Sequence, residues 1–110
     1  MNDIYRDICE KLDWRVTSDG DGNIELEKYS PAGEDFIITF GEENFVDNVK
    51  AYAASFDQEE HIEMWVEAKR NKVANVPSIK ELVEDAQAID DMLRELACAL
   101  FEAELEVVGA

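Results

Sequence analysis

The sequence predicts an α+β fold in which a small three-stranded antiparallel sheet packs against three to four helices, including a long C-terminal helix. Apolar residues recur every three or four positions near both ends of the chain, whereas apolar and polar residues alternate in between. With 110 residues, 46% of them hydrophobic, the chain is large enough for one domain with its own core. No linker-like segment divides it, so a single acidic domain is expected over 1–110.

The first helix and the three strands are expected before residue 41. Ile4, Ile8 and Leu12 are four positions apart, which predicts a helix over 3–13. Extended segments are then expected at 14–18, 24–30 and 36–40. Turn-forming sequences rich in Asp, Gly, Asn and Pro separate these segments, so the strands are expected to form an antiparallel meander.

After Gly41 the pattern becomes helical. Phe45, Val49, Tyr52 and Phe56 are spaced as on one face of a helix. Two capping boxes, in which a cap residue is followed three positions later by glutamate, predict further helix starts at Asp57 and Ser78. The helix from Asp57 is expected to end near 71–72, and a break is expected at 76–78.

The last helix is expected over 79–106. An apolar seam with steps of three and four runs from Ile79 to Leu100, widened by Val83, Ala97 and Phe101. Such a helix measures about 42 Å, whereas a compact domain of this size has a radius of gyration of about 13 Å. The helix is therefore expected to protrude, to kink, to fray at its C-terminal turns or to pack against a second copy.

The charge is the most unusual property of the sequence. The chain has 27 acidic and 10 basic residues and a formal net charge of −17. This charge argues against direct binding to nucleic acid or to an anionic membrane, both of which require an excess of Lys and Arg. No apolar run approaches the roughly 18–20 residues that span a bilayer, and no signal-peptide pattern opens the chain. A cytoplasmic protein is expected.

No catalytic or cofactor motif is found. Asp19, Asp21 and Asn23 have the first spacings of a calcium loop, but Ile24 and Ser30 stand where that loop requires Gly and Glu. A hairpin loop is therefore favoured. His61 is the only histidine and has no second nitrogen or sulfur ligand nearby in sequence, which favours an ordinary helical histidine.

The two cysteines are also given a structural interpretation. Cys9 and Cys98 are too few for a disulfide scaffold, and both lie among apolar residues, where a free cysteine is usually a small buried side chain. No metal, cofactor or catalytic residue is predicted, and the protein is expected not to be an enzyme.

The candidate binding residues are six carboxylates on the last two predicted helices. Carboxylates one helical turn apart are about 5–6 Å apart, which is comparable to the spacing of phosphates along a DNA strand. Such a row could occupy a groove in which Lys and Arg normally hold a phosphate backbone. The alternative is a solvated face that only keeps the protein soluble. The candidates are Glu59, Glu63, Glu67, Glu84, Asp91 and Glu95.

Two segments carry a resemblance. Residues 56–69 (FDQEEHIEMWVEAK) and 76–86 (VPSIKELVEDA) resemble a family of small acidic proteins of Firmicutes phages and conjugative elements. The similarity covers about 15–100, and the family brings no activity and no catalytic residues. In size, charge and order of elements the chain also resembles small acidic anti-CRISPR proteins and DNA-mimicking antirestriction proteins.

These observations predict a non-enzymatic inhibitor from a mobile element. It would block a host defence nuclease, a CRISPR effector or a restriction enzyme, by occupying the basic groove that binds nucleic acid. The alternative is a dimeric interaction or regulatory module that acts through its C-terminal helix.

Overall fold

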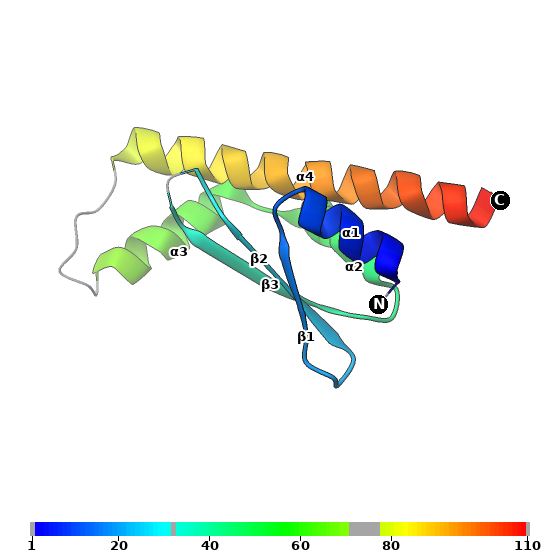
Figure 1. The fold of residues 1–110 in the computed structure, drawn as a ribbon. Coiled ribbons are helices and arrows are strands. Elements are labelled where there is room, and N and C mark those ends of the chain that lie inside the picture. Colours follow the sequence, from blue (N-terminus) through cyan, green and yellow to red (C-terminus); the bar gives the residue numbers. More distant parts are fainter. Residues whose placement is uncertain (1, 32, 71–77, 110) are drawn as a thin grey trace.

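The computed structural model describes residues 2–31, 33–70 and 78–109, and it has the expected α+β fold (Figure 1). A three-stranded antiparallel sheet is combined with four helices, the last of which is the longest. In chain order the elements are α1 (Asp3–Lys11), β1 (Arg15–Ser18), β2 (Asn23–Tyr29), β3 (Asp35–Gly41), α2 (Phe45–Ser55), α3 (Gln58–Arg70) and α4 (Ile79–Gly109).

The sheet is the predicted meander, with strand order β1-β2-β3 and antiparallel pairing throughout. Leu26 of β2 lies opposite Val16 of β1 and Ile38 of β3. Alternate side chains of β2 and β3 are buried, while side chains between them, such as those of Glu25 and Thr39, face solvent, as expected for a sheet covered on one face. The helices lie on the buried face (Figure 1).

The predicted helix caps are present. The Asp57 carboxylate accepts hydrogen bonds from the backbone N–H groups of Glu59 (3.0 Å) and Glu60 (3.2 Å), so it caps α3. Ser78 Oγ accepts from the N–H of Glu81 at 3.3 Å and caps α4. The expected end of the α3 helix at 71–72 and most of the expected break at 76–78 lie outside the described residues.

The helix α4 is one continuous helix that runs along the whole molecule (Figure 1). The molecule measures 52 × 27 × 22 Å, with a radius of gyration of 15.2 Å, so it is elongated along this helix. The helix runs without a kink (Figure 1). The other three helices all pack against α4. Its buried apolar side chains join those of the sheet and α2 in the core: Ile89, Leu93, Leu96, Ala97 and Leu100.

Two of the residues expected to widen the seam of α4 lie at its margin. Val83 and Phe101 are 36% and 38% exposed. They lie too far around the helix from Ile89 and Leu96 to reach the core, because successive residues are rotated by about 100°. Among the described residues, no helix has the length and apolar character needed to cross a membrane.

Candidate functional site

The six predicted carboxylates are all exposed, and they form two rows. The first row, called here the α3 row, consists of Glu59, Glu63 and Glu67. These residues are one helical turn apart and lie on the side of α3 that faces away from Gln58 and His61, its contacts to the rest of the protein. The three side chains therefore point into solvent and are free of core packing.

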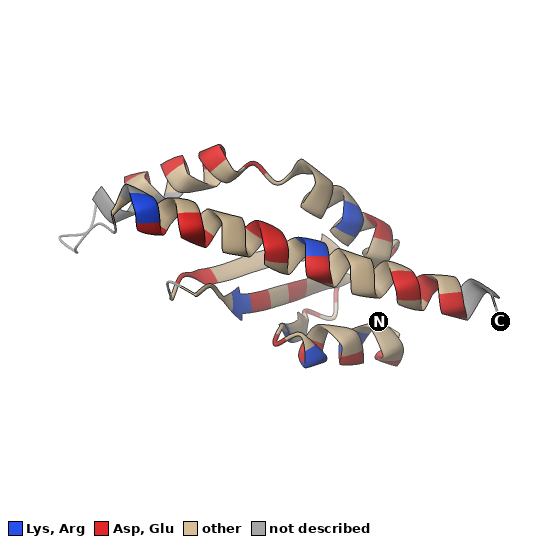
Figure 2. Ribbon diagram, turned by 90° about the horizontal axis from the view of Figure 1, so that it is seen from above, with Lys and Arg blue, Asp and Glu red and all other residues tan. Residues whose placement is uncertain are grey.

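The second row, the α4 row, consists of Glu84, Asp91 and Glu95, which lie opposite the buried stripe of α4. Lys80 Nζ lies 4.0 Å from Glu84 Oε1, and both side chains are largely exposed, so this ion pair is weak. Acidic segments are visible along both helices when the molecule is viewed onto α4 (Figure 2). The structure thus presents each row to solvent as the sequence predicted, on adjacent helices.

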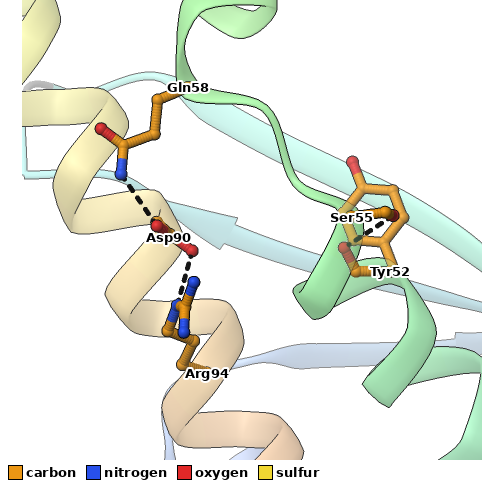
Figure 3. A network of polar contacts seen from close by, with 5 residues as sticks. All are labelled: Tyr52, Ser55, Gln58, Asp90 and Arg94. Carbon is orange, nitrogen blue, oxygen red and sulfur yellow. Dashed lines mark hydrogen bonds and ion pairs between the residues drawn. The ribbon is translucent and has the colours of Figure 1, made fainter.

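A polar contact fixes the start of α3 against α4 (Figure 3). Asp90, which is 9% exposed, accepts hydrogen bonds from Gln58 Nε2 at 2.8 Å and from Arg94 Nε at 3.0 Å. Burial opposes ionisation, but these two hydrogen bonds outweigh it and lower the pKa of Asp90 below its usual value. The buried carboxylate is therefore ionised and ties the two helices together.

A second cluster lies deeper, where three elements meet. Glu34 precedes β3, His61 belongs to α3 and Asp85 belongs to α4. His61 Nε2 lies 3.0 Å from Glu34 Oε2, the two side chains are 13% and 18% exposed, and Asp85 is 2% exposed. One nitrogen or oxygen atom from each of the three side chains lies within 4.8 Å of the others. We call these residues the Glu34–His61–Asp85 cluster.

Local structure holds each member of this cluster in place. The turn before β3 is closed by Ser30, whose Oγ accepts from the N–H of Glu34 at 3.0 Å and whose N–H donates to the Glu34 carbonyl at 2.8 Å. The His61 ring packs against Phe36 and Phe56, with centroid distances of 5.8 and 5.5 Å. The third member, Asp85, lies on the buried stripe of α4. All three side chains are therefore mostly buried and held by contacts with neighbouring elements.

The two carboxyl groups of the cluster influence each other. Burial raises the pKa of Glu34 above its usual value; the hydrogen bond with His61 lowers this pKa, and the hydrogen bond with Asp85 raises it. Two neighbouring carboxyl groups resist simultaneous ionisation because of the repulsion between their charges. A positive charge placed between the two carboxyl groups would therefore stabilise their ionised forms.

Two cavities adjoin the cluster on different sides. Glu34 and His61 line a cavity of about 430 Å³, together with side chains of β3, α2 and α3 such as Phe56 and Met64. Asp85 lines another of about 410 Å³ with Glu84 and Pro31. Solvent and small ligands therefore have access to the edge of the cluster, although its members are mostly buried.

The cysteines differ from each other, and one expectation was wrong. Cys9 is fully buried, and burial raises the pKa of its thiol to about 12. Cys98, which was also expected to be buried, is exposed, because it lies on the solvent side of α4 even though its sequence neighbours Ala97 and Leu96 are buried. A thiol with the pKa of Cys9 is not a nucleophile at neutral pH.

The turn with calcium-like spacing is a hairpin loop between β1 and β2, as favoured from the sequence. Asp19 accepts hydrogen bonds from the N–H groups of Asp21 (2.7 Å) and Asn23 (3.2 Å), and from Asn23 Nδ2 (2.9 Å). These hydrogen bonds, chiefly that from the Asn23 side chain, lower the pKa of Asp19. Hydrogen bonds within the loop therefore explain the presence of Asp19 without a bound ion.

Sequence reasoning missed Glu34 and Asp85 as partners of His61. The tertiary fold alone brings Glu34 close to His61, which is 27 residues away. The burial of Asp85 could have been recognised from the sequence. Asp85 is three residues after Leu82 and four before Ile89, so it occupies a core position of the apolar seam. A charged residue at such a position is rarely buried without partners.

No protein-family model matches the chain, and neither the curated proteins nor the solved structures include a significant match.

Proposed function

We propose that this protein is a non-enzymatic inhibitor of mobile-element origin that binds the basic nucleic-acid groove of a host defence nuclease, either a CRISPR effector or a restriction enzyme. The observation that carries the proposal is the exposure of both carboxylate rows on neighbouring helices of a protein with a net charge of −17. Such an inhibitor acts in the cytoplasm of the bacterial host, where these nucleases meet foreign DNA.

The physical basis is the competition of carboxylates with phosphates. Glu59, Glu63 and Glu67 are repeated at every turn, so their spacing of about 6 Å suits successive Lys or Arg side chains along a groove. Residues 51–68 contain no Lys or Arg, so the basic residues of α3 are confined to its last two positions, Lys69 and Arg70, after the end of the row. Charge complementarity of this kind accelerates association and penalises partners of the wrong sign.

The test is a cleavage assay with a panel of RNA-guided nucleases and restriction enzymes. An α3 triple variant and a control triple variant each change the net charge by +6, because each acidic-to-Lys substitution adds two charges. The control positions are exposed and lie on the sheet and its loops. The α3 variant is Glu59→Lys, Glu63→Lys, Glu67→Lys, and the control variant is Asp21→Lys, Glu25→Lys, Glu43→Lys.

We expect the wild type and the control variant to inhibit at least one nuclease, with inhibition that weakens steeply as salt rises. The α3 variant should lose inhibition at least tenfold while its circular dichroism stays native. An equal loss of inhibition in both variants would assign the effect to overall charge, and full inhibition by the α3 variant would exclude the α3 row from the mechanism. An absence of inhibition across the panel would reject the proposed function.

A second candidate function, a dimeric interaction module, is favoured by one observation. Between α2 and α4 lies a shallow apolar depression of about 360 Å³, lined by Ala53, Ala54, Ala97, Cys98 and Phe101 among others. The Phe101→Asp substitution would abolish dimerisation or partner binding if this surface is used. Analytical ultracentrifugation over a range of concentrations separates this candidate from the first, because an inhibitor that acts through α3 is indifferent to this change.

A further inference from the structure

We propose that the Glu34–His61–Asp85 cluster binds one divalent transition-metal ion, with Zn²⁺ the best suited. No metal was expected from the sequence, because His61 has no second ligand near it in the chain. The fold supplies two carboxylates from other elements. The inference is independent of the proposed inhibitory function.

The donor set is appropriate. Zinc is held by histidine nitrogen at about 2.0–2.1 Å and by carboxylate oxygen at about 2.0–2.2 Å. Tetrahedral geometry then places the ligand atoms about 3.3 Å from one another. His61 Nε2 and Glu34 Oε2 are already 3.0 Å apart, and no ligand atom of the cluster is more than 4.8 Å from another. Small side-chain adjustments bring all three onto one ion.

The charge balance is favourable as well. The two carboxyl groups contact each other in a site where Asp85 is 2% exposed, so ionising both of them without compensation is costly. A protonated His61 offers one positive charge, whereas a divalent ion offers two and leaves the imidazole neutral. The neutral imidazole and two carboxylates are the forms that bind metal.

The surroundings leave one coordination position accessible. Three protein ligands occupy three positions of a tetrahedral ion, and a water molecule or a small ligand commonly takes the fourth. The cavity of about 430 Å³ beside Glu34 and His61 supplies room for such a molecule. Because the ligands come from the turn before β3, from α3 and from α4, the bound ion would join these three elements.

The histidine makes the test direct, because His61 is the only one in the chain. Its ring nitrogens give a single pair of signals in an ¹H–¹⁵N spectrum of ¹⁵N-labelled protein. Metal-free protein is titrated with ZnCl₂, and with MgCl₂ and CaCl₂ for comparison. We expect saturation at one equivalent of zinc, with a large shift of the Nε2 signal and little change at Nδ1. Nonspecific binding to surface carboxylates would leave both signals in place and would overturn the proposal.

Calorimetry with variants provides the second arm. Asp85→Asn and Glu34→Gln preserve side-chain shape and each remove one charged ligand; each should weaken zinc binding at least thirtyfold. The matched control is Glu60→Gln, since Glu60 lines the same cavity but is not part of the cluster. Its affinity should stay within threefold of wild type. An equal affinity in all four proteins would overturn the proposal, and circular dichroism verifies that each variant is folded.

Discussion

The two halves of α4 hold their partner helices by different means. In the first half, α3 is attached through polar side chains: Gln58 donates to Asp90, and His61 lies beside Glu34 and Asp85. In the second half, α2 packs through apolar side chains such as Val49 and Ala53, which belong to the same core as Leu93, Leu96 and Leu100. Apolar packing supplies stability without strict geometry, whereas the polar half fixes specific atoms at a cost in desolvation.

The comparison explains where a functional site is expected. Apolar side chains of the same shape are often as stabilising as a buried polar cluster, or more so, and stability alone therefore does not account for the polar cluster in the first half. The exposed α3 row belongs to α3, the helix that the first half of α4 holds through these polar contacts.

The largest effect is expected from Leu96→Ala in the apolar half. Leu96 is fully buried, so the substitution removes buried methyl groups and leaves a cavity. The free energy of unfolding should fall by about 2–5 kcal/mol, measured by urea denaturation followed by circular dichroism. The exposed neighbour Glu95→Ala is the control and should change it by less than about 0.5 kcal/mol. A loss below about 1 kcal/mol for Leu96→Ala would mean that this half is not the main source of stability.

A smaller loss is expected from His61→Ala in the polar half. The substitution removes the hydrogen-bond partner of Glu34 and leaves two carboxyl groups facing each other, which should cost about 1–3 kcal/mol in metal-free buffer. The loss should shrink when Glu34→Gln is already present, because a neutral amide does not need the histidine. Equal losses in both backgrounds would attribute the effect of His61 to its packing on Phe36 and Phe56 alone.

The Asp90→Asn substitution should lower the free energy of unfolding by about 1 kcal/mol near neutral pH, and this loss should depend on pH. The hydrogen bonds lower the pKa of Asp90 in the folded state, so its stabilising contribution is complete above the unfolded value of about 3.9. It is lost as the pH falls from there through the folded value. The stability gap between wild type and Asp90→Asn should thus be constant above about pH 5 and should narrow below about pH 4.

The control for this experiment is Asp91→Asn, a change at the exposed neighbour of Asp90. It removes the same charge from α4 without touching Gln58 or Arg94. If the difference in the free energy of unfolding between the wild type and Asp91→Asn also narrowed over this pH range, the pH dependence would come from the net charge of the protein and not from the buried contact.

The smallest effect on stability is expected at Cys98, on the exposed side of the apolar half. Cys98→Ser should change the free energy of unfolding by less than about 0.5 kcal/mol. A thiol reagent should label Cys98 rapidly in the native protein and should label Cys9 only when the protein unfolds, since Cys9 is buried and its pKa is about 12. Rapid labelling of two thiols would show that α1 detaches from the core.

Much of the fold could be predicted because the local spacing of apolar and capping residues determines where its strands and helices form. The alternation around Leu26 and Ile38 and the caps at Asp57 and Ser78 depend on neighbours a few residues away, so the strands and helix starts were found within one or two residues. The exposure of the two carboxylate rows followed from the same periodicity. Cys98 was misjudged because apolar neighbours in sequence do not share its side of the helix.

The polar cluster could not be predicted, for a physical reason. Its members come from a turn and two helices, and their approach depends on how α3 crosses α4, which no local pattern specifies. A helical sequence indicates which side is buried, yet the crossing angle and the register between two helices are set by side-chain packing. Only Asp85 could have been recognised from the sequence, because it is an acidic residue at a core position of the apolar seam.

The position of α4 in the chain has a consequence for synthesis. Every other helix packs on α4, yet α4 follows all of them in the sequence. Until α4 has been synthesised, the apolar side chains of the sheet, such as Ile24 and Leu26, lack the part of the core that α4 supplies. Only when residues near Leu100 have left the exit tunnel can the core close. The core therefore closes only after α4 has been added to the chain, and the many acidic residues keep the segments made before α4 in solution until then.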